Sequence, residues 1–396
     1  MTAKPNKALP EPNDNAKQRS VQLSDKIRRH LQRHGQLAFA QFMQLTLYTP
    51  GLGYYANGLP KIGAQGDFIT APEISPLFSR CLARQAQQAL SQLGTPNLIE
   101  FGAGRGIMAR DILLELDRLE AKFDHYFIIE LSGDLKQTQQ QTLQTLPAHL
   151  AQKVVWLDQL PSQPLQAVVL ANEVLDAMPV ECIKLEPAQQ SHAFVVWNET
   201  TQQFDWQYQP ITQPALQRFA NQLLKHIGEP SERGYHTEVN LHIAPWLQSI
   251  SDFLSAGLVL LIDYGYPRHE YYQPARHMGT LRCHYQHRAH SNPFFYPGLQ
   301  DITAHVDFTA VAEAAFDAKF KVAGYTTQAH FLMATGLLEM AEQPDATVTE
   351  QLKIAQQIKT LTLPNEMGEN FKVIALSKQL DLALIGFKLR DLRHQL

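Results

Sequence analysis

An acidic residue followed by three glycines at every second position is the strongest chemical signal in this sequence. Residues 100–106 read E-F-G-A-G-R-G and follow the apolar residues Leu98 and Ile99. Glycine lets a chain turn sharply and approach a ligand closely, because it has no Cβ. The next residues, 107–120, have apolar side chains at helical spacing. We expect a buried strand, a glycine loop and a helix that together hold a nucleotide-type cofactor.

The spacing of these glycines favours S-adenosylmethionine over a dinucleotide. A pyrophosphate fingerprint reads G-x-G-x-x-G and would need a third glycine where this chain has Ile107. S-adenosylmethionine carries a sulfonium, an ammonium and a ribose diol in place of phosphates, and a strand-end carboxylate with exposed backbone can hold these groups. An NAD-linked oxidoreductase is therefore the weaker alternative. A glycine-rich turn that binds nothing is the structural alternative.

Three further apolar runs also end in polar side chains. The runs lie between residues 126 and 173. The first ends in Glu130, the second in Asp158 and the third in the pair Asn172 and Glu173. The carboxyl ends of parallel strands form the ligand crevice of an open α/β sheet. In that arrangement an acid about 20 residues beyond the glycines binds the ribose hydroxyls. Glu130 lies at about such a distance from the glycine loop.

Charge and cysteine content exclude several other classes of protein. The chain has 396 residues with 34 basic and 38 acidic side chains, and its net charge of −4 gives no field for nucleic acid. Its cysteines, Cys81, Cys182 and Cys283, form no C-x-x-C pair, so neither a disulfide framework nor a thiolate metal site is indicated. The compartment is therefore expected to be reducing. Since no run of 18 apolar residues occurs, we expect no membrane span.

Several histidines invite comparison with a metal site. His284, His287 and His290 are three residues apart in a loop flanked by Pro and Arg, a spacing that does not converge on one ion. We therefore assign no metal. His305 and Asp307 form an H-x-D pair, in which we expect Asp307 to cap the helix that follows. We keep His287 and His305 as candidates for contact with the substrate.

Changes in pattern along the chain predict its division into segments. Alternating strands and helices surround the glycine loop, whereas a later region reads as short β-like runs and a helix. Residues 267–304 form a long loop rich in Pro, Gly, Tyr and His that we expect to be ordered and functional. The expected parts are a disordered tail (1–20), an N-terminal helical segment with a loop that covers the cofactor (21–95), an α/β core (96–180 and 251–396) and an inserted α+β subdomain (181–250).

Seven short motifs spread over about residues 20–380 carry a family resemblance. They are GLGYY (51–55), GDFITAPE (66–73), EFGAGRG (100–106), ANEVLDAMP (171–179), IDYGY (262–266), GTL (279–281) and PGLQDITAHVDF (297–308). Together they resemble the MidA-like family of class I S-adenosylmethionine-dependent methyltransferases. The mitochondrial members of that family act as assembly factors for respiratory complex I.

This resemblance implies a fold, a cofactor and a substrate class. The expected fold is α/β, with a Rossmann-like, mostly parallel seven-stranded sheet, helices on both faces and an N-terminal helical extension. The expected cofactor is S-adenosylmethionine. Because the mitochondrial relatives are linked to arginine methylation of a complex I subunit, the expected substrate is an arginine side chain of a protein.

Cofactor contacts are expected at the strand ends and in one preceding loop. Glu130 is assigned to the ribose hydroxyls, Asn172 to the methionine part, and Asp158 to the adenine amine unless it is an ordinary exposed loop acid. The segment 66–70 either closes over the cofactor or forms an ordinary turn. The expected cofactor-binding residues are Glu100, Gly102, Ala103, Gly104, Gly106, Glu130, Leu131, Asp158, Asn172, Gly66, Asp67 and Thr70.

Two acids just beyond the fourth apolar run, Glu173 and Asp176, are the candidates for catalysis. Methyl transfer is an in-line displacement at a carbon already activated by the sulfonium, so the main task is to hold the nucleophile in near-attack geometry. An arginine nucleophile is always protonated, with a pKa above ~12, and carboxylates can grip it and accept its proton. Cofactor positioning or a helix N-terminal acid is the alternative for each. The candidates on the substrate side are Tyr264, Tyr266, His287 and His305.

Other functions stay compatible with the sequence. A cofactor-binding assembly module without catalysis is one alternative, and a small-molecule methyltransferase is another. The D/N-P-P-Y/F segment common among enzymes that methylate nucleic-acid amines is absent from residues 171–174. We expect a protein partner and no nucleic acid, with 181–250 and 267–304 as regions for a partner or a homodimer contact. The first residues are not Arg-rich and amphipathic, which favours a bacterial cytoplasmic protein over a mitochondrial-matrix one.

Overall fold

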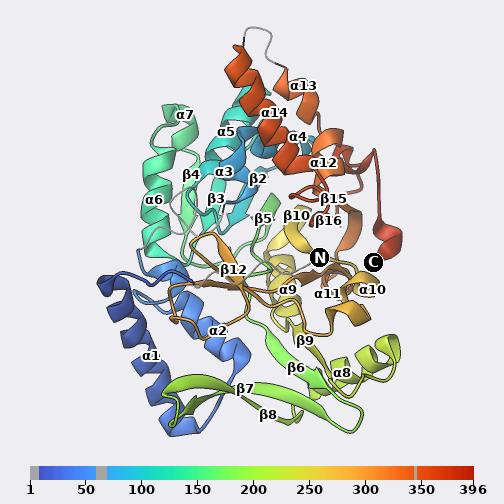
Figure 1. The fold of residues 1–396 in the computed structure, drawn as a ribbon. Coiled ribbons are helices and arrows are strands. Elements are labelled where there is room, and N and C mark those ends of the chain that lie inside the picture. The colour runs from blue at the N-terminus through green and yellow to red at the C-terminus, as the bar shows by residue number, and fades with distance from the viewer. Residues whose placement is uncertain (1–8, 59–68, 343–345) are drawn as a thin grey trace. The chain divides into compact units, whose positions relative to one another are not determined.

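The chain forms two compact units, each assembled from three separate stretches of sequence. The computed structural model describes residues 9–58, 69–342 and 346–396 (Figure 1). Unit 1 takes its residues from the stretches 1–69, 179–240 and 274–304. Unit 2 takes its residues from the stretches 70–178, 241–273 and 305–396, and it contains the glycine loop and the polar strand ends.

Unit 2 is built on seven strands in one row, with a short eighth strand beside them. The row runs β15-β16-β10-β5-β2-β3-β4, and β14 pairs with β10. The strands from β4 to β10 in this row are parallel, as is β14, whereas β16 runs antiparallel between β10 and β15. The expected seven-stranded, mostly parallel sheet is thereby confirmed. The strands are β2 (Pro96–Phe101), β3 (Tyr126–Ile129), β4 (Val154–Leu157), β5 (Leu165–Asn172), β10 (Leu254–Tyr266), β14 (Val306–Asp307), β15 (Lys321–Thr327) and β16 (Phe371–Lys378).

Helices cover both faces of this sheet, because its strands alternate between two apolar layers. In β10, Leu258 and Leu260 pack with α4, α5 and α12, whereas Val259 and Leu261 pack with α9 and α11. Strands buried on both faces are typical of a parallel α/β sheet. The helices of unit 2 are α3 (Ala71–Ile74), α4 (Pro76–Leu90), α5 (Ile107–Arg118), α6 (Gly133–Leu143), α7 (Ala148–Ala151), α9 (Ile243–Phe253), α10 (Arg268–Tyr271), α11 (Phe308–Asp317), α12 (Gln328–Ala334), α13 (Leu337–Ala341), α14 (Val348–Thr362), η3 (Ile385–Phe387) and η4 (Arg393–Gln395).

Unit 1 contains two antiparallel sheets and a pair of N-terminal helices. One sheet has the order β1-β7-β6-β9 with β8 beside β7, and the other has the order β12-β11-β13. Its core joins α1 and α2 to β7 and β8 through Ile27, Phe42, Val195 and Phe204. The elements are α1 (Asp14–His34), β1 (Leu37–Ala38), α2 (Phe39–Tyr48), η1 (Tyr54–Ala56), β6 (Glu181–Leu185), β7 (Gln190–Asn198), β8 (Gln203–Pro210), α8 (Pro214–Ile227), β9 (Tyr235–Val239), η2 (Pro274–Arg276), β11 (Arg282–Tyr285), β12 (Arg288–His290) and β13 (Asp301–Thr303).

The expectation of a disordered tail over residues 1–20 is wrong for residues 14–20. Helix α1 begins at Asp14, and the side chain of Asn13 caps it by accepting a hydrogen bond from the Ala16 amide at 2.9 Å. Ala16 and Ser20 are buried and continue the helical stripe of Leu23 towards the N-terminus. Because both side chains are small and Ser20 is polar, the pattern of large apolar residues does not mark these positions as part of a helix.

The region 267–304 is also more regular than the long loop we expected. It holds α10 and the three short strands β11, β12 and β13. The turn between β11 and β12 consists of Gln286 and His287, with φ angles of 46° and 57°. Two-residue hairpin turns of this kind usually contain Asn or Gly. Because neither residue type is present in the turn, no residue pattern marks it as a hairpin.

Unit boundaries follow contacts in space and therefore differ from the expected parts. The sequence predicts residues 70–95 as part of the N-terminal segment, but α4 packs its Leu82 and Ala86 into the core of unit 2. The sequence predicts residues 274–304 as part of the α/β core, but they belong to unit 1. Among the described residues, no helix combines the length and apolar character needed to cross a bilayer.

The stability of unit 2 depends on the middle of β10. Leu260 is fully buried between β5 and β16, so we expect Leu260→Ala to lower the free energy of unfolding by about 2–5 kcal/mol. Leu352→Ala on α14 is the matched control, since Leu352 is 66% exposed and its loss should change stability by less than about 0.5 kcal/mol. Denaturant unfolding of both variants is the measurement. Equal losses would contradict this view of the core.

Candidate functional site

The glycine loop between β2 and α5 has a backbone that only glycine adopts easily. Gly102, Gly104 and Gly106 have φ angles of 64°, 52° and 80°. A Cβ on Gly106 would lie 3.2 Å from the Cα of Gln139, and one on Gly102 would lie 3.3 Å from a methyl of Val174. The loop therefore presents main chain, without side chains at these positions, at the carboxyl end of β2.

Gln139 on α6 ties this loop to the two neighbouring strands. Its Nε2 donates to the carbonyl oxygen of Gly104 at 3.0 Å and to Oε2 of Glu130 at 2.9 Å. Its Oε1 accepts from Nε1 of Trp156 on β4 at 3.0 Å. Sequence reasoning missed Gln139, because a glutamine in a Gln-rich helix carries no distinguishing signal.

The predicted ribose and adenine residues follow β3 and β4. Glu130 Oε1 accepts from the Ser132 amide at 2.9 Å, which fixes the carboxylate directly after β3. Leu131 beside it is 84% exposed, an unusual position for a large apolar side chain and one suited to the face of a base. Asp158 follows β4 and pairs with Lys136 at 2.8 Å in an exposed ion pair. Its assignment to the adenine amine stays a prediction.

Glu100 is more deeply placed than its position in the motif suggested. The side chain is 1% exposed, and one oxygen accepts a hydrogen bond from the Tyr126 hydroxyl at 2.6 Å. The other oxygen has no hydrogen-bond partner among the described residues. Burial raises the pKa of the Glu100 carboxyl to about 7, although the Tyr126 hydroxyl opposes the shift. This second Glu100 oxygen could accept a hydrogen bond from a positively charged group such as an ammonium.

The loop predicted to cover the cofactor is described only from residue 69 onwards. Gly66 and Asp67 lie outside the described residues. Thr70 comes directly before the short helix α3, where Glu73 pairs with Arg105 of the glycine loop at 3.2 Å. This ion pair places the start of α3 beside the loop, as a covering role for Thr70 requires.

The second half of the site lies where β5 ends. Asn172 is the last residue of β5, and its Nδ2 donates to Oε1 of Glu173 at 3.1 Å. Its Oδ1 is buried without a partner among the described residues. Glu173 has a φ of 53°, and its amide donates to the carbonyl oxygen of Ile262 on β10 at 2.9 Å. The chain therefore leaves β5 in a tight turn that is bonded to β10.

Asp176 lies in this turn, 4% exposed, next to another buried acid, Asp263. Burial raises the pKa of the Asp176 carboxyl to about 6, and a hydrogen bond from the Tyr264 side chain partly offsets the shift. Burial and the neighbouring charges of Asp176 and Glu173 hold the pKa of Asp263 well above its usual range. Sequence reasoning did not assign Asp263 to the site, although it ends an apolar run as the other strand-end acids do.

Three of the four candidates on the substrate side lie together in unit 2. The ring of His305 is 5.2 Å from that of Tyr264 and 5.4 Å from that of Tyr266. The pairing of β14 with β10 fixes this arrangement, and a Cβ on Gly265 would lie 2.1 Å from the Val306 carbonyl oxygen. His287 belongs to unit 1 instead. It is an exposed residue of the β11–β12 turn, so its position is explained by its place in the hairpin.

The capping role expected for Asp307 is confirmed. Its Oδ1 accepts hydrogen bonds from the amides of Thr309 and Ala310 at 3.0 and 3.1 Å, which makes it the N-cap of α11. A cap satisfies amides at the start of a helix that have no partner within the helix. Asp307 therefore has a structural role next to Tyr266, its register partner in β10.

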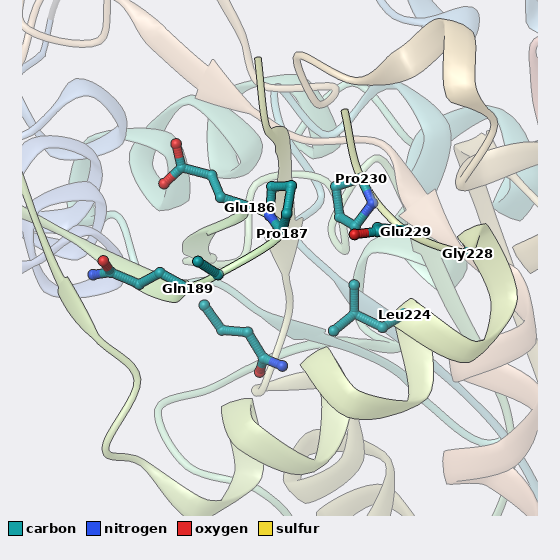
Figure 2. A pocket seen from close by; sticks show the side chains of 9 residues that line it. Glu186, Pro187, Gln189, Leu224, Gly228, Glu229 and Pro230 are labelled. Atoms are coloured by element: carbon teal, nitrogen blue, oxygen red, sulfur yellow. The ribbon is translucent and has the colours of Figure 1, made fainter. Parts of the chain in front are cut away.

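A separate cavity of about 380 Å³ occurs in unit 1 (Figure 2). The β6–β7 turn, with Glu186 and Pro187, forms one part of its wall, and the end of α8, with Leu224, forms another. None of the predicted site residues lines it. The cavity therefore gives no information about the cofactor.

Two solved structures from Burkholderia thailandensis resemble the whole chain. One, bound to S-adenosyl-homocysteine, is 40% identical with a TM-score of 0.93, and the match covers 98% of this chain and 100% of that chain. The other, a native structure, is 39% identical with a TM-score of 0.89 and the same coverage.

More distant relatives include the Protein arginine methyltransferase NDUFAF7 homolog, mitochondrial, of Drosophila melanogaster. It is 28% identical over 94% of this chain and 88% of its own length. The human Protein arginine methyltransferase NDUFAF7, mitochondrial, is 26% identical over 86% of this chain and 80% of its own length. The family described as "Putative S-adenosyl-L-methionine-dependent methyltransferase" matches residues 81–326, more than half of the chain. The chain therefore belongs to this methyltransferase family, as its glycine loop and its MidA-like motifs predict.

Proposed function

We propose that this protein transfers a methyl group from S-adenosylmethionine to a guanidinium nitrogen of arginine in a protein substrate. One observation carries the proposal. The glycine loop and the turn with Glu173 and Asp176 follow two strands, β2 and β5, that are hydrogen-bonded to each other in parallel. Cofactor loop and acids therefore share one edge of the sheet. The arginine specificity is supported by the relatives named as protein arginine methyltransferases.

The residues at this edge fit S-adenosylmethionine. The loop has main chain alone at its glycine positions, two of which leave little space for a Cβ beside Gln139 and Val174. Glu100 and Asn172 each have a buried oxygen without a partner among the described residues. Glu100 and Asn172 would hold the methionine part, Glu130 the ribose hydroxyls, and Leu131 with Asp158 the adenine. When bound, the cofactor supplies a methyl group on a positively charged sulfur.

Carboxylates beside the methyl group would serve an arginine nucleophile in two ways. A guanidinium is planar, and it stays charged at neutral pH because its pKa is above about 12. Two carboxylate oxygens can hold it in a fixed orientation. After transfer, the methylated nitrogen must lose a proton, and an ionised carboxylate accepts it. Asp176 is suited to this step because its raised pKa makes it a stronger base than an ordinary aspartate.

The glycine loop provides a direct test of cofactor binding. We expect Gly106→Ala to weaken binding of S-adenosyl-homocysteine at least about 10-fold, since a residue with a Cβ is strained at this φ by about 1–3 kcal/mol and would press on Gln139. Gly133→Ala is the matched control, because a Cβ there meets nothing within 4 Å. Calorimetric titration of both variants is the measurement. Unchanged affinity in Gly106→Ala would remove the loop from the cofactor site.

Tritium transfer from the labelled methyl group of S-adenosylmethionine tests the substrate class. With a bacterial protein extract as acceptor, we expect the label in methylarginine after hydrolysis of the protein. Glu173→Gln and Asp176→Asn should lower the rate by about 10²–10⁴-fold, while S-adenosyl-homocysteine binding stays within a few fold of the wild type.

Three other results of this assay would argue against the proposal. Label in methyllysine or in the small-molecule fraction would replace the arginine assignment with another substrate. Cofactor binding without any transfer would favour an assembly module that does not catalyse. Full activity in both acid variants would remove Glu173 and Asp176 from catalysis.

The raised pKa of Asp176 predicts a pH dependence. An acid whose pKa is about 6 in the folded protein is an ionised base above that pH and loses this form as the pH falls. Methyl transfer should therefore decline as the pH falls from 7 to 5, whereas an ordinary aspartate would stay ionised over this range. S-adenosyl-homocysteine affinity is measured at each pH, because Glu100 titrates near 7. A constant rate down to pH 5 would contradict the role of Asp176.

A further inference from the structure

Asp263 is a buried acid at the edge of the sheet that the proposed reaction does not use. It lies in β10 near its carboxyl end and is 1% exposed. Its Oδ2 accepts hydrogen bonds from the amides of Leu175 at 3.0 Å and Asp176 at 3.2 Å, and its Oδ1 accepts from the Tyr264 amide at 2.9 Å. Both oxygens therefore act as acceptors, and three main-chain amides hold the carboxyl group in one orientation.

Two of these amides belong to the turn that carries the proposed catalytic acids. The same turn is bonded to β10 a second time, through the Glu173 amide and the Ile262 carbonyl oxygen at 2.9 Å. The side chain of Tyr264, which follows Asp263 in β10, bonds to Asp176. The positions of Glu173 and Asp176 relative to β5 are thus set from β10, and the Asp263 carboxyl is the side chain that holds the main chain of the turn at Leu175 and Asp176.

The charges around Asp263 make it a costly residue for a purely structural role. The negative charges of Glu173 and Asp176, both in the turn, disfavour a negative charge on Asp263. A cationic residue on the adjacent strand is Lys372, the register partner of Asp263 in β16. Tyr264 and His305 are the other titratable groups of this cluster. A buried acid next to two others opposes folding unless its hydrogen bonds compensate. An uncharged residue would avoid the repulsion but could not accept all three hydrogen bonds.

We propose that Asp263 is a positioning residue for methyl transfer, which fastens the turn of residues 173–176 so that Glu173 and Asp176 keep one arrangement beside the cofactor loop. The inference rests on the proposed function, because it takes these two acids as the groups that serve the nucleophile. Small displacements of such groups lower rates strongly. Asp263 itself touches neither substrate nor cofactor in this proposal.

Amide hydrogen exchange tests the attachment without any substrate. In Asp263→Ala the amides of Leu175 and Asp176 lose their acceptor, so we expect them to exchange about 10-fold faster or more. Amides in the middle of β5 and β10, such as those of Val169 and Leu260, should keep their wild-type rates. Asp307→Ala is the matched control, since it removes another buried, capping aspartate of unit 2 and should leave the Leu175 and Asp176 amides unchanged.

Kinetics of Asp263→Asn test the consequence for the reaction. The amide keeps the size of the side chain and one acceptor oxygen, but its nitrogen cannot accept a hydrogen bond. We expect kcat for methyl transfer to fall about 10–100-fold, with the KM for the protein acceptor and the Kd for S-adenosyl-homocysteine within about 2-fold of the wild type. Asp307→Asn should stay near wild type in all three, because Asn also caps helices well.

The possible outcomes separate this inference from the proposed function. Unchanged exchange of the Leu175 and Asp176 amides would overturn the attachment, and faster exchange with an unchanged kcat would overturn the positioning role. Loss of S-adenosyl-homocysteine binding together with a lower Tm would assign Asp263 a structural role instead. If the wild-type protein transfers no methyl group, both the proposed function and this inference are wrong. If the wild type is active and Asp263→Asn has the same kcat, only this inference is wrong.

Discussion

The parallel pairing of β5 with β2 on one side and β10 on the other is the constraint on which the rest of the site depends. It brings residues 100–106, 172–176 and 263–266 to one edge of a sheet, although they are far apart in sequence. Each segment follows or ends a strand that is buried on both faces, so its position is fixed by the core of unit 2. A site built in this way inherits the rigidity of the sheet.

Burial of the acids near this edge lowers the stability of the fold, and nearby hydrogen-bond donors reduce this cost. Glu100, Asp176 and Asp263 are almost completely buried, and burial raises the pKa of each. Each has a specific compensating donor: the Tyr126 hydroxyl for Glu100, the Tyr264 side chain for Asp176 and main-chain amides for Asp263. Buried acids that are only partly compensated are typical of functional sites.

Features with local signals could be predicted from the sequence, and features that depend on contacts could not. The apolar runs with polar ends gave the parallel sheet, and the spacing of Asp307 before a helix gave its cap. Helix α1 was underestimated because its first buried residues are the small Ala16 and Ser20. Gln139 and Asp263 were missed because their importance arises from main-chain groups that only the folded chain brings to them.

Charge balance at this edge supports the proposed arginine nucleophile. The turn after β5 and the end of β10 together carry the acids Glu173, Asp176 and Asp263, whose mutual repulsion helps to raise the pKa of Asp263, and Lys372 is the register partner of Asp263 in β16. A sulfonium adds one positive charge, so a cationic acceptor such as a guanidinium would bring the local charges closer to balance than a neutral hydroxyl would. Because a guanidinium is weakly hydrated and planar, it gives up water more readily than an ammonium and matches paired carboxylates. Under the proposed function, the acids that make this edge costly to fold are therefore the feature that would favour arginine over a neutral substrate.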